Sequence, residues 1–174
     1  MKHIETTRLL LRSMVADDVD HVMRLFNDPK VAQAFGLDDF DFNQAKRWLE
    51  RNLMHQEEHG FGLYSVILKE AGDWIGDCGL ECSEFNGHEA VEIGYDLLSA
   101  HWGCGYATEA ALAVRDAATN DLDISGNRLC CFIRHGNRPS VRVAEKLGMV
   151  LNQQFKKRGV FYSLFAYPDA PFTD

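Results

Sequence analysis

A short loop with two glycines, at residues 102–107 (WGCGYA), is the first stretch of this sequence that could do chemistry. It follows a strand-like run and precedes an alanine-rich segment with helical character. The N-terminus of a helix carries unpaired backbone N–H groups and a partial positive charge, which suit a pyrophosphate. Glycine lets the backbone approach such an anion because it has no Cβ. The spacing is neither a Walker loop nor a dinucleotide GxGxxG, so a plain tight turn is the alternative.

A carboxylate upstream of this loop is the best candidate for a general base. Glu92 lies in a strand-like run, where period-two alternation places it on one face with Gly94 and Asp96. A carboxylate in a cleft could take a proton from an amine, directly or through a water molecule. The alternative is a solvated or salt-bridged strand glutamate. Glu81 and Glu84 are weaker candidates for the same role.

The periodicity of the apolar residues predicts the elements that would position these groups. Strands are expected at residues 8–12, 64–68, 74–82, 90–98, 129–134, 150–155 and 160–167, and helices at about 18–26, 43–59, 107–122 and 137–147. Turn sequences between neighbouring strands make those pairs antiparallel, whereas the strand–helix–strand passage after residue 92 requires a parallel pair. The predicted fold is α/β (α+β), one domain spanning residues 1–174, with a mixed, mostly antiparallel sheet and helices on both faces.

Local signals also predict where two of these helices begin and end. Asp17 and Asp18 are expected to cap the first helix, and Asn27, Asp28 and Pro29 to end it. Gly148 provides a natural stop for the last predicted helix.

The composition and charge restrict the classes of function. The chain has 174 residues, 46% hydrophobic and 25% charged, and a domain of this size buries about two-thirds of its unfolded surface. No apolar run approaches the ~18 residues that span a bilayer, and the first residues lack the apolar core of a signal peptide. We expect a cytoplasmic protein without a membrane partner.

A net charge of -8 argues against a nucleic-acid partner, because phosphate backbones need clustered Lys and Arg. An acidic surface suits a cationic partner such as an amine. The alternative is that the charge only aids solubility.

The five cysteines and seven histidines form no metal-ligand pattern in the sequence. The cysteine count is odd and there is no CxxC pair, while Cys130 and Cys131 would face opposite sides of one strand. Reduced, mostly buried thiols are the simple interpretation. His55 and His59 lie four apart on a predicted helix without a third ligand nearby in the sequence. We therefore predict no metal site and place this pair on the surface.

Six short blocks lie along most of the chain in a fixed order: residues 5–12 (ETTRLLLR), 74–76 (WIG), 92–97 (EIGYDL), 102–110 (WGCGYATEA), 137–140 (NRPS) and 145–149 (EKLGM). Together, at these spacings, they resemble the GNAT acetyltransferase superfamily, and most closely its ribosomal-protein N-terminal acetyltransferase branch (the RimJ/RimL type). In the superfamily's pyrophosphate loop, Gly105 and Ala107 would occupy the small-residue positions and Trp102 the first position. Cys104 departs from the branch, which often carries Lys or Arg there.

The resemblance implies acetyl-CoA as cosubstrate, no metal, and a parallel strand pair that opens for the pantetheine arm. Coenzyme contacts are then expected from Ile93, Tyr95, Leu97, Leu98, Trp102, Gly103, Cys104, Gly105, Tyr106, Ala107, Asn137 and Ser140. From their apolar neighbours alone, the rings of Tyr95 and Tyr106 are interpreted as packing residues.

The resemblance also implies the catalytic pair. Glu92 lies close to where other branches place a catalytic glutamate, and Ser140 matches a serine near the coenzyme sulfur, where it would act as the acid. Asn137 would hydrogen-bond the pantetheine arm. The alternative is that Asn137 caps its helix and Ser140 merely lies in the first turn.

The expected function is that of an acetyl-CoA-dependent N-acetyltransferase whose acceptor is a protein N-terminal α-amine. A small amine such as a polyamine or aminoglycoside is the alternative acceptor, and an acyl-CoA-binding module without turnover is the alternative class. Cys104 is either an exposed, reactive thiol shielded by bound coenzyme or an inward-facing apolar filler.

Overall fold

The computed structural model describes residues 1–172 and contains one mixed sheet with helices packed on it. The strands are β1 (Ile4–Glu5), β2 (Leu9–Ser13), β3 (Leu63–Leu68), β4 (Asp73–Phe85), β5 (His88–Leu97), β6 (Leu129–Arg134), β7 (Val150–Lys157) and β8 (Val160–Ala166). The α-helices are α1 (Val19–Phe26), α2 (Pro29–Phe35), α3 (Phe42–His59), α4 (Tyr106–Asp121) and α5 (Arg138–Lys146). The predicted α/β class is confirmed, and none of the described helices is long and apolar enough to cross a membrane.

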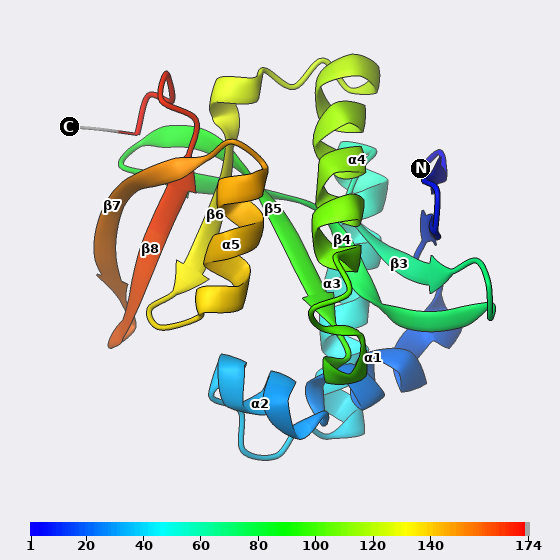
Figure 1. The fold of residues 1–174 in the computed structure, drawn as a ribbon. Coiled ribbons are helices and arrows are strands. Elements are labelled where there is room, and N and C mark those ends of the chain that lie inside the picture. The colour runs from blue at the N-terminus through cyan, green and yellow to red at the C-terminus, as the bar shows by residue number, and fades with distance from the viewer. Residues whose placement is uncertain (173–174) are drawn as a thin grey trace.

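The sheet opens in its middle. Its strand order is β1-β2-β3-β4-β5-β6-β8-β7, and β5 with β6 is the one parallel pair among the described strands. The register of this pair covers only Val91 with Leu129 and Glu92 with Cys130. Beyond these residues the two strands diverge, as Figure 1 shows, while β6 continues to pair with β8. The backbone of β5 after Glu92 is therefore available to a ligand that can hydrogen-bond like a strand.

Alternation along β5 assigns its side chains to two layers. Ile93 and Leu97 belong to the main core, which α4 covers with Ala110, Val114 and neighbouring small residues. The face that bears Gly94 is the opposite one, because a Cβ at Gly94 would lie 3.4 Å from the Leu63 side chain, which packs on α3. Helices thus cover both faces, as the sequence predicts, and Glu92 and Asp96 share the α3-side face of β5 with Gly94.

Helix α2 is the main element that the sequence analysis missed. We expected Pro29 to end the first helix, and α1 does end at Phe26, but Pro29 also begins α2. Asp28 caps α2 by accepting hydrogen bonds from the N–H groups of Lys30 and Val31. Proline is favoured in the first turn because the N–H it lacks has no partner there anyway. One residue run therefore stops one helix and starts the next.

The cap predicted at Asp18 is also wrong in detail. A short 3₁₀ turn, Ala16–Asp18, precedes α1, and the Asp18 side chain does not cap α1. Its carboxylate instead pairs with the Arg12 guanidinium (Nη2 to Oδ1, 2.6 Å) and accepts the Ser65 hydroxyl at 3.0 Å. This buried carboxylate fastens the start of α1 to β2 and β3. The two-residue strand β1 was not predicted either.

Candidate active site

The glycine loop has the backbone geometry that the sequence suggested. Gly103 and Gly105 have φ values of 79° and 82°, in the left-handed region that strains other residues. Gly105 is the N-cap of α4 and offers no side chain to the first turn. The N–H groups there are left for solvent or a ligand. Trp102 holds the start of the loop by donating its indole N–H to the Leu97 carbonyl at 2.7 Å.

A pocket lies where this loop, the open edge of β5 and the start of α5 meet. Nine of the expected coenzyme residues line it: Tyr95, Leu97, Trp102, Gly103, Gly105, Tyr106, Ala107, Asn137 and Ser140. A second pocket on the β6 side is lined by Glu92, Ile93 and Gly94. The two pockets share six residues: Ala34, Phe35, Tyr95, Asp96, Asn137 and Ser140. Residues far apart in sequence are thus brought to one opening in the sheet.

Two expected coenzyme residues lie outside both pockets. The Leu98 side chain is buried in a separate apolar cluster with Trp74 and residues of α1, because the chain turns away from the sheet there. Cys104 is exposed, with its carbonyl turned to Arg8. The thiol is therefore not an inward-facing filler, and Cys82 is the other exposed cysteine of this chain.

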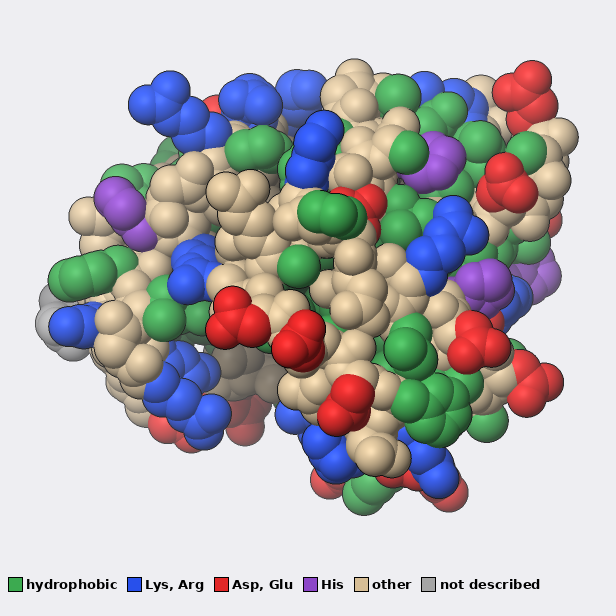
Figure 2. Space-filling view, turned by 90° about the horizontal axis from the view of Figure 1, so that it is seen from below, with side chains coloured by type: hydrophobic (Ala, Val, Ile, Leu, Met, Phe, Trp, Pro, Cys, Tyr) green, Lys and Arg blue, Asp and Glu red, His purple; other side chains and the backbone are tan. Residues whose placement is uncertain are grey.

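Sequence reasoning missed several pocket residues. Val31, Ala34 and Phe35 come from the unpredicted helix α2, and Arg142 and Lys146 come from α5. The two cations are four residues apart, so they share a helix face, and this spacing was a readable signal. They give the first pocket positive charge that Cys104 does not supply. On the face seen from below in Figure 2, Lys and Arg side chains are interspersed with Asp and Glu.

Glu92 stands in the electrostatic setting of a general base. The side chain is half-buried and lines the second pocket. Burial raises the pKa of Glu92 to about 8, with repulsion from Glu81 adding to the rise, while the Phe132 N–H opposes it. Glu81 lies directly opposite Glu92 in the β4–β5 register. A carboxylate with a pKa near the working pH is well matched to moving a proton.

A second acidic pair, Asp77 and Asp96, lies opposite each other on the same two strands. Asp77 is 0% exposed, and neither carboxylate oxygen has a hydrogen-bond partner among the described residues. Burial raises the pKa of Asp77 well above its ordinary range, and repulsion from Asp96 raises it further. Burial and Glu81 likewise raise the pKa of Asp96, which lines both pockets. The site therefore contains carboxyl groups that a cation would help to ionise.

This buried pair predicts an unusual dependence of stability on pH. The folded state binds the Asp77 proton more tightly than the unfolded state, whose pKa is about 3.9. The free energy of unfolding should therefore fall as pH rises from about 4 toward the folded pKa. Asp77→Asn removes that loss, so the variant should lose less stability than the wild type between pH 5 and 8. Urea unfolding at both pH values measures this, with the exposed Asp73→Asn on the same strand as control. Equal losses in both variants would contradict a buried, proton-binding Asp77.

Ser140 lies at the junction of the two pockets. Its N–H donates to Asn137 Oδ1 at 3.2 Å, and its carbonyl accepts the Tyr95 hydroxyl at 2.8 Å. Asn137 thus does cap α5, as the alternative interpretation held, while both residues also line the pockets. Tyr95 both packs on the core and ties β5 to α5 across the opening. The Ser140 hydroxyl has no hydrogen bond to another described residue.

Ser140→Ala tests whether that hydroxyl assists a departing thiolate. The bonds that hold Ser140 use its backbone, so the variant should keep them and fold normally. We expect kcat to fall about tenfold, in the range of a lost proton transfer. Steady-state kinetics and thermal melting measure the two effects. A changed melting temperature with an unchanged kcat would assign Ser140 to the helix turn alone.

One possible ligand cluster lies away from this opening. His55 and His59 of α3 lie with Cys82 of β4, their ligand atoms within 4.8 Å of one another. The sequence analysis missed this third group because Cys82 is remote along the chain. His55 already uses both ring nitrogens, toward the Phe61 carbonyl at 2.9 Å and the Cys82 N–H at 3.0 Å. The ring is occupied by bonds that join α3 to β4, so the geometry gives no ready metal site.

Comparisons with known proteins agree with this architecture. Residues 8–150 match the acetyltransferase (GNAT) domain family. The uncharacterized protein YkkB of Bacillus subtilis is 34% identical over 154 residues, 87% of each chain. An acetyltransferase structure from Agrobacterium tumefaciens is 27% identical, with a TM-score of 0.78 over 96% of this chain and 94% of that one. RimL, a ribosomal L7/L12 α-N-protein acetyltransferase solved with coenzyme A, is 19% identical, with a TM-score of 0.76 over 95% and 96%.

The splayed parallel pair and the glycine loop that opens α4 thus define an acetyltransferase fold. The chain belongs to the GNAT acetyltransferase family. Its structural neighbours include ribosomal-protein acetyltransferases at 19% identity, a likeness that shows a shared fold.

Proposed function

We propose that this chain, acting as one cytoplasmic domain over residues 1–174, transfers the acetyl group of acetyl-CoA to a primary amine. The observation that carries the proposal is the convergence of the open β5 edge, the glycine loop, Glu92 and Ser140 on two adjoining pockets. The first pocket suits the coenzyme in two respects. It offers unpaired N–H groups and cations for phosphates, and a free strand edge for amides.

The residues of the chain divide the work of acetyl transfer. Gly103, Gly105 and the first turn of α4 would bind the pyrophosphate, with Arg142 and Lys146 adding charge. The β5 backbone after Glu92 would hold the pantetheine arm, and one of its N–H groups would face the acetyl oxygen. Glu92 would take the proton from the amine, directly or through water, and Ser140 would donate to the sulfur.

The acceptor that we propose is the α-amine of a protein N-terminus. Support comes from the sequence resemblance and from RimL, a neighbour named as an α-N-protein acetyltransferase. A second candidate, a small polyamine, is favoured by a specific observation. Asp96 lines both pockets, with buried Asp77 opposite it in the register, so a second positive charge on the acceptor would find a carboxyl group on the same face of β5 as Glu92.

Thiol release from acetyl-CoA tests the proposed reaction. The purified protein is incubated with acetyl-CoA and, in separate reactions, with N-terminal peptides, polyamines or aminoglycosides. We expect amine-dependent release of free coenzyme A, and mass spectrometry should locate the acetyl group on a primary amine. Release with peptides supports the α-amine proposal, and release with polyamines alone supports the second candidate. Tight coenzyme binding without release by any amine would support a binding module instead.

A further inference from the structure

We propose that Arg8 is a positioning residue for coenzyme binding, which it promotes by fixing the glycine loop from the N-terminal end of the chain. This inference rests on the proposed binding of acetyl-CoA at that loop. Arg8 lies between β1 and β2, some hundred residues before the loop in sequence, and lines neither pocket. It therefore acts through the loop rather than through the substrate pockets.

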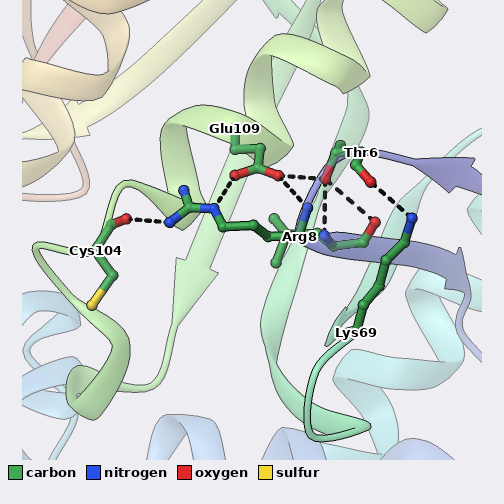
Figure 3. Close-up of polar contacts among 6 residues, drawn as sticks. Thr6, Arg8, Lys69, Cys104 and Glu109 are labelled. Carbon is green, nitrogen blue, oxygen red and sulfur yellow. Dashed lines mark hydrogen bonds and ion pairs between the residues drawn. The ribbon is translucent and has the colours of Figure 1, made fainter.

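The contacts of Arg8 converge on the loop and on the first turn of α4. Its Nε donates to Glu109 Oε2 at 2.6 Å, its backbone N–H donates to Glu109 Oε1 at 2.9 Å, and its Nη1 donates to the Cys104 carbonyl at 3.0 Å. The guanidinium carbon also lies 4.4 Å from the centre of the Tyr106 ring. Figure 3 shows the side chain extended between the carboxylate and the loop carbonyl. A forked guanidinium can hold two acceptors in fixed directions, which an ammonium cannot.

The bond to the Cys104 carbonyl has a consequence for the next N–H group. A trans peptide is planar, so the Gly105 N–H points opposite to the Cys104 carbonyl. Arg8 and Cys104 lie outside the pocket, whereas Gly105 lines it. With the carbonyl held on Arg8, the Gly105 N–H is directed away from Arg8, toward the pocket side of the loop. Flexible glycines would otherwise allow this peptide to rotate.

Glu109 gives Arg8 a second, electrostatic task. A carboxylate in the first turn of α4 lies near the helix end where an anionic ligand should bind, and it would repel that ligand. The pKa of Glu109 is lowered, because hydrogen bonds from Thr6 and Arg8 outweigh the opposing effect of burial, so the group is ionised at neutral pH. Arg8 supplies the countercharge at 2.6 Å. The cation absent at Cys104 is thus placed beside the loop by a residue remote in sequence.

A matched pair of substitutions tests this role. Arg8→Met removes the fork and keeps an apolar stem. Lys69→Met removes a cation that follows β3 and binds Glu5 and the Thr6 carbonyl of the β1–β2 segment at 2.8 Å each, but does not contact the loop. Acetyl-CoA affinity is measured by calorimetry, and kcat at saturating acetyl-CoA. We expect affinity to fall about tenfold in Arg8→Met, the weight of one charge-assisted hydrogen bond. It should stay within about twofold in Lys69→Met, while kcat changes little in either.

The Cys104 thiol reports on the loop without any coenzyme. Maleimide labelling of Cys104, relative to the exposed Cys82, should accelerate in Arg8→Met and stay unchanged in Lys69→Met. A purely structural role would lower the melting temperature without this selective change. If Arg8→Met does not fold, Arg8→Lys keeps the charge but not the fork, and it should show the same two changes to a smaller degree. Wild-type affinity and labelling in the folded variant would overturn the inference. Failure of the wild type to bind acetyl-CoA would instead refute the proposed function.

Discussion

A Glu92→Gln protein should bind acetyl-CoA as the wild type does and turn over about 10²-fold more slowly. Glutamine keeps the shape of the side chain and its place on β5 but cannot accept the amine proton. Glu92 lies on the second pocket, apart from the glycine loop that would hold the phosphates. Steady-state kinetics measures the loss of kcat, and calorimetry measures whether acetyl-CoA binding is unchanged. Glu81→Gln is the matched control, since Glu81 is the cross-strand neighbour of Glu92.

The pH profile gives this prediction a second readout. With a pKa of about 8, Glu92 is mostly protonated below that value, and only about 1% is ionised at pH 6. Deprotonation of Glu92 should contribute a rise of about tenfold per pH unit to the wild-type kcat/KM up to about pH 8, the limb of a base in the free enzyme. The acceptor amine adds its own limb, which must persist in Glu92→Gln, while the limb of Glu92 disappears. A near-wild-type kcat in Glu92→Gln, or a large loss of kcat in Glu81→Gln, would show that Glu92 is not the general base.

Most of the fold could be predicted because its signals are local. Strand alternation, turn glycines and the alanine-rich run at 107–122 indicated seven of the eight strands and four of the five α-helices within the described chain. Helix α2 escaped because Pro29 was interpreted as a stop signal only. The two residues of β1 are too few to produce a period. Local rules thus failed where one residue serves two elements or where pairing alone makes the strand.

The site residues also fall into those that local signals predict and those that depend on the assembled sheet. The glycine loop, Glu92 and Ser140 could be found because each has a signal in its own neighbourhood. The pairing of Asp77 with Asp96 could not be predicted, because it depends on the register between β4 and β5. The turn at 86–87 sets that register only once the ends of the two strands are known. The bond between Arg8 and Glu109 joins residues 101 positions apart. Electrostatic partners of this kind become visible only when the sheet is assembled.

Gly105→Glu should abolish measurable binding of acetyl-CoA, with a rise in Kd of at least about 10²-fold. Gly105 caps α4 and lines the first pocket, and a Cβ built there lies 3.5 Å from Arg8 Nη2. The new carboxylate would therefore stand at the N-terminus of α4 beside the guanidinium that holds the loop, where it would repel the pyrophosphate and compete with Glu109 for Arg8. Its φ of 82° also strains any residue with a Cβ, at a cost of about 1–2 kcal/mol. That strain alone could lower stability, so the charge effect needs a control with the same backbone demand.

Gly72→Glu supplies that control. Gly72 has a φ of 72° in the turn between β3 and β4, and nothing lies within 4 Å of a Cβ built there. It carries the same strain and the same charge but is remote from the loop in the sheet, so acetyl-CoA affinity should stay within about twofold of wild type. Calorimetry on both variants, after circular dichroism has shown that each is folded, measures the difference. Both variants carry the same backbone strain and the same added charge. A difference in their acetyl-CoA affinity is therefore due to the position of the substitution in the loop. Equal affinities in two folded proteins would place the phosphates away from the N-terminus of α4, and with them the coenzyme site proposed here.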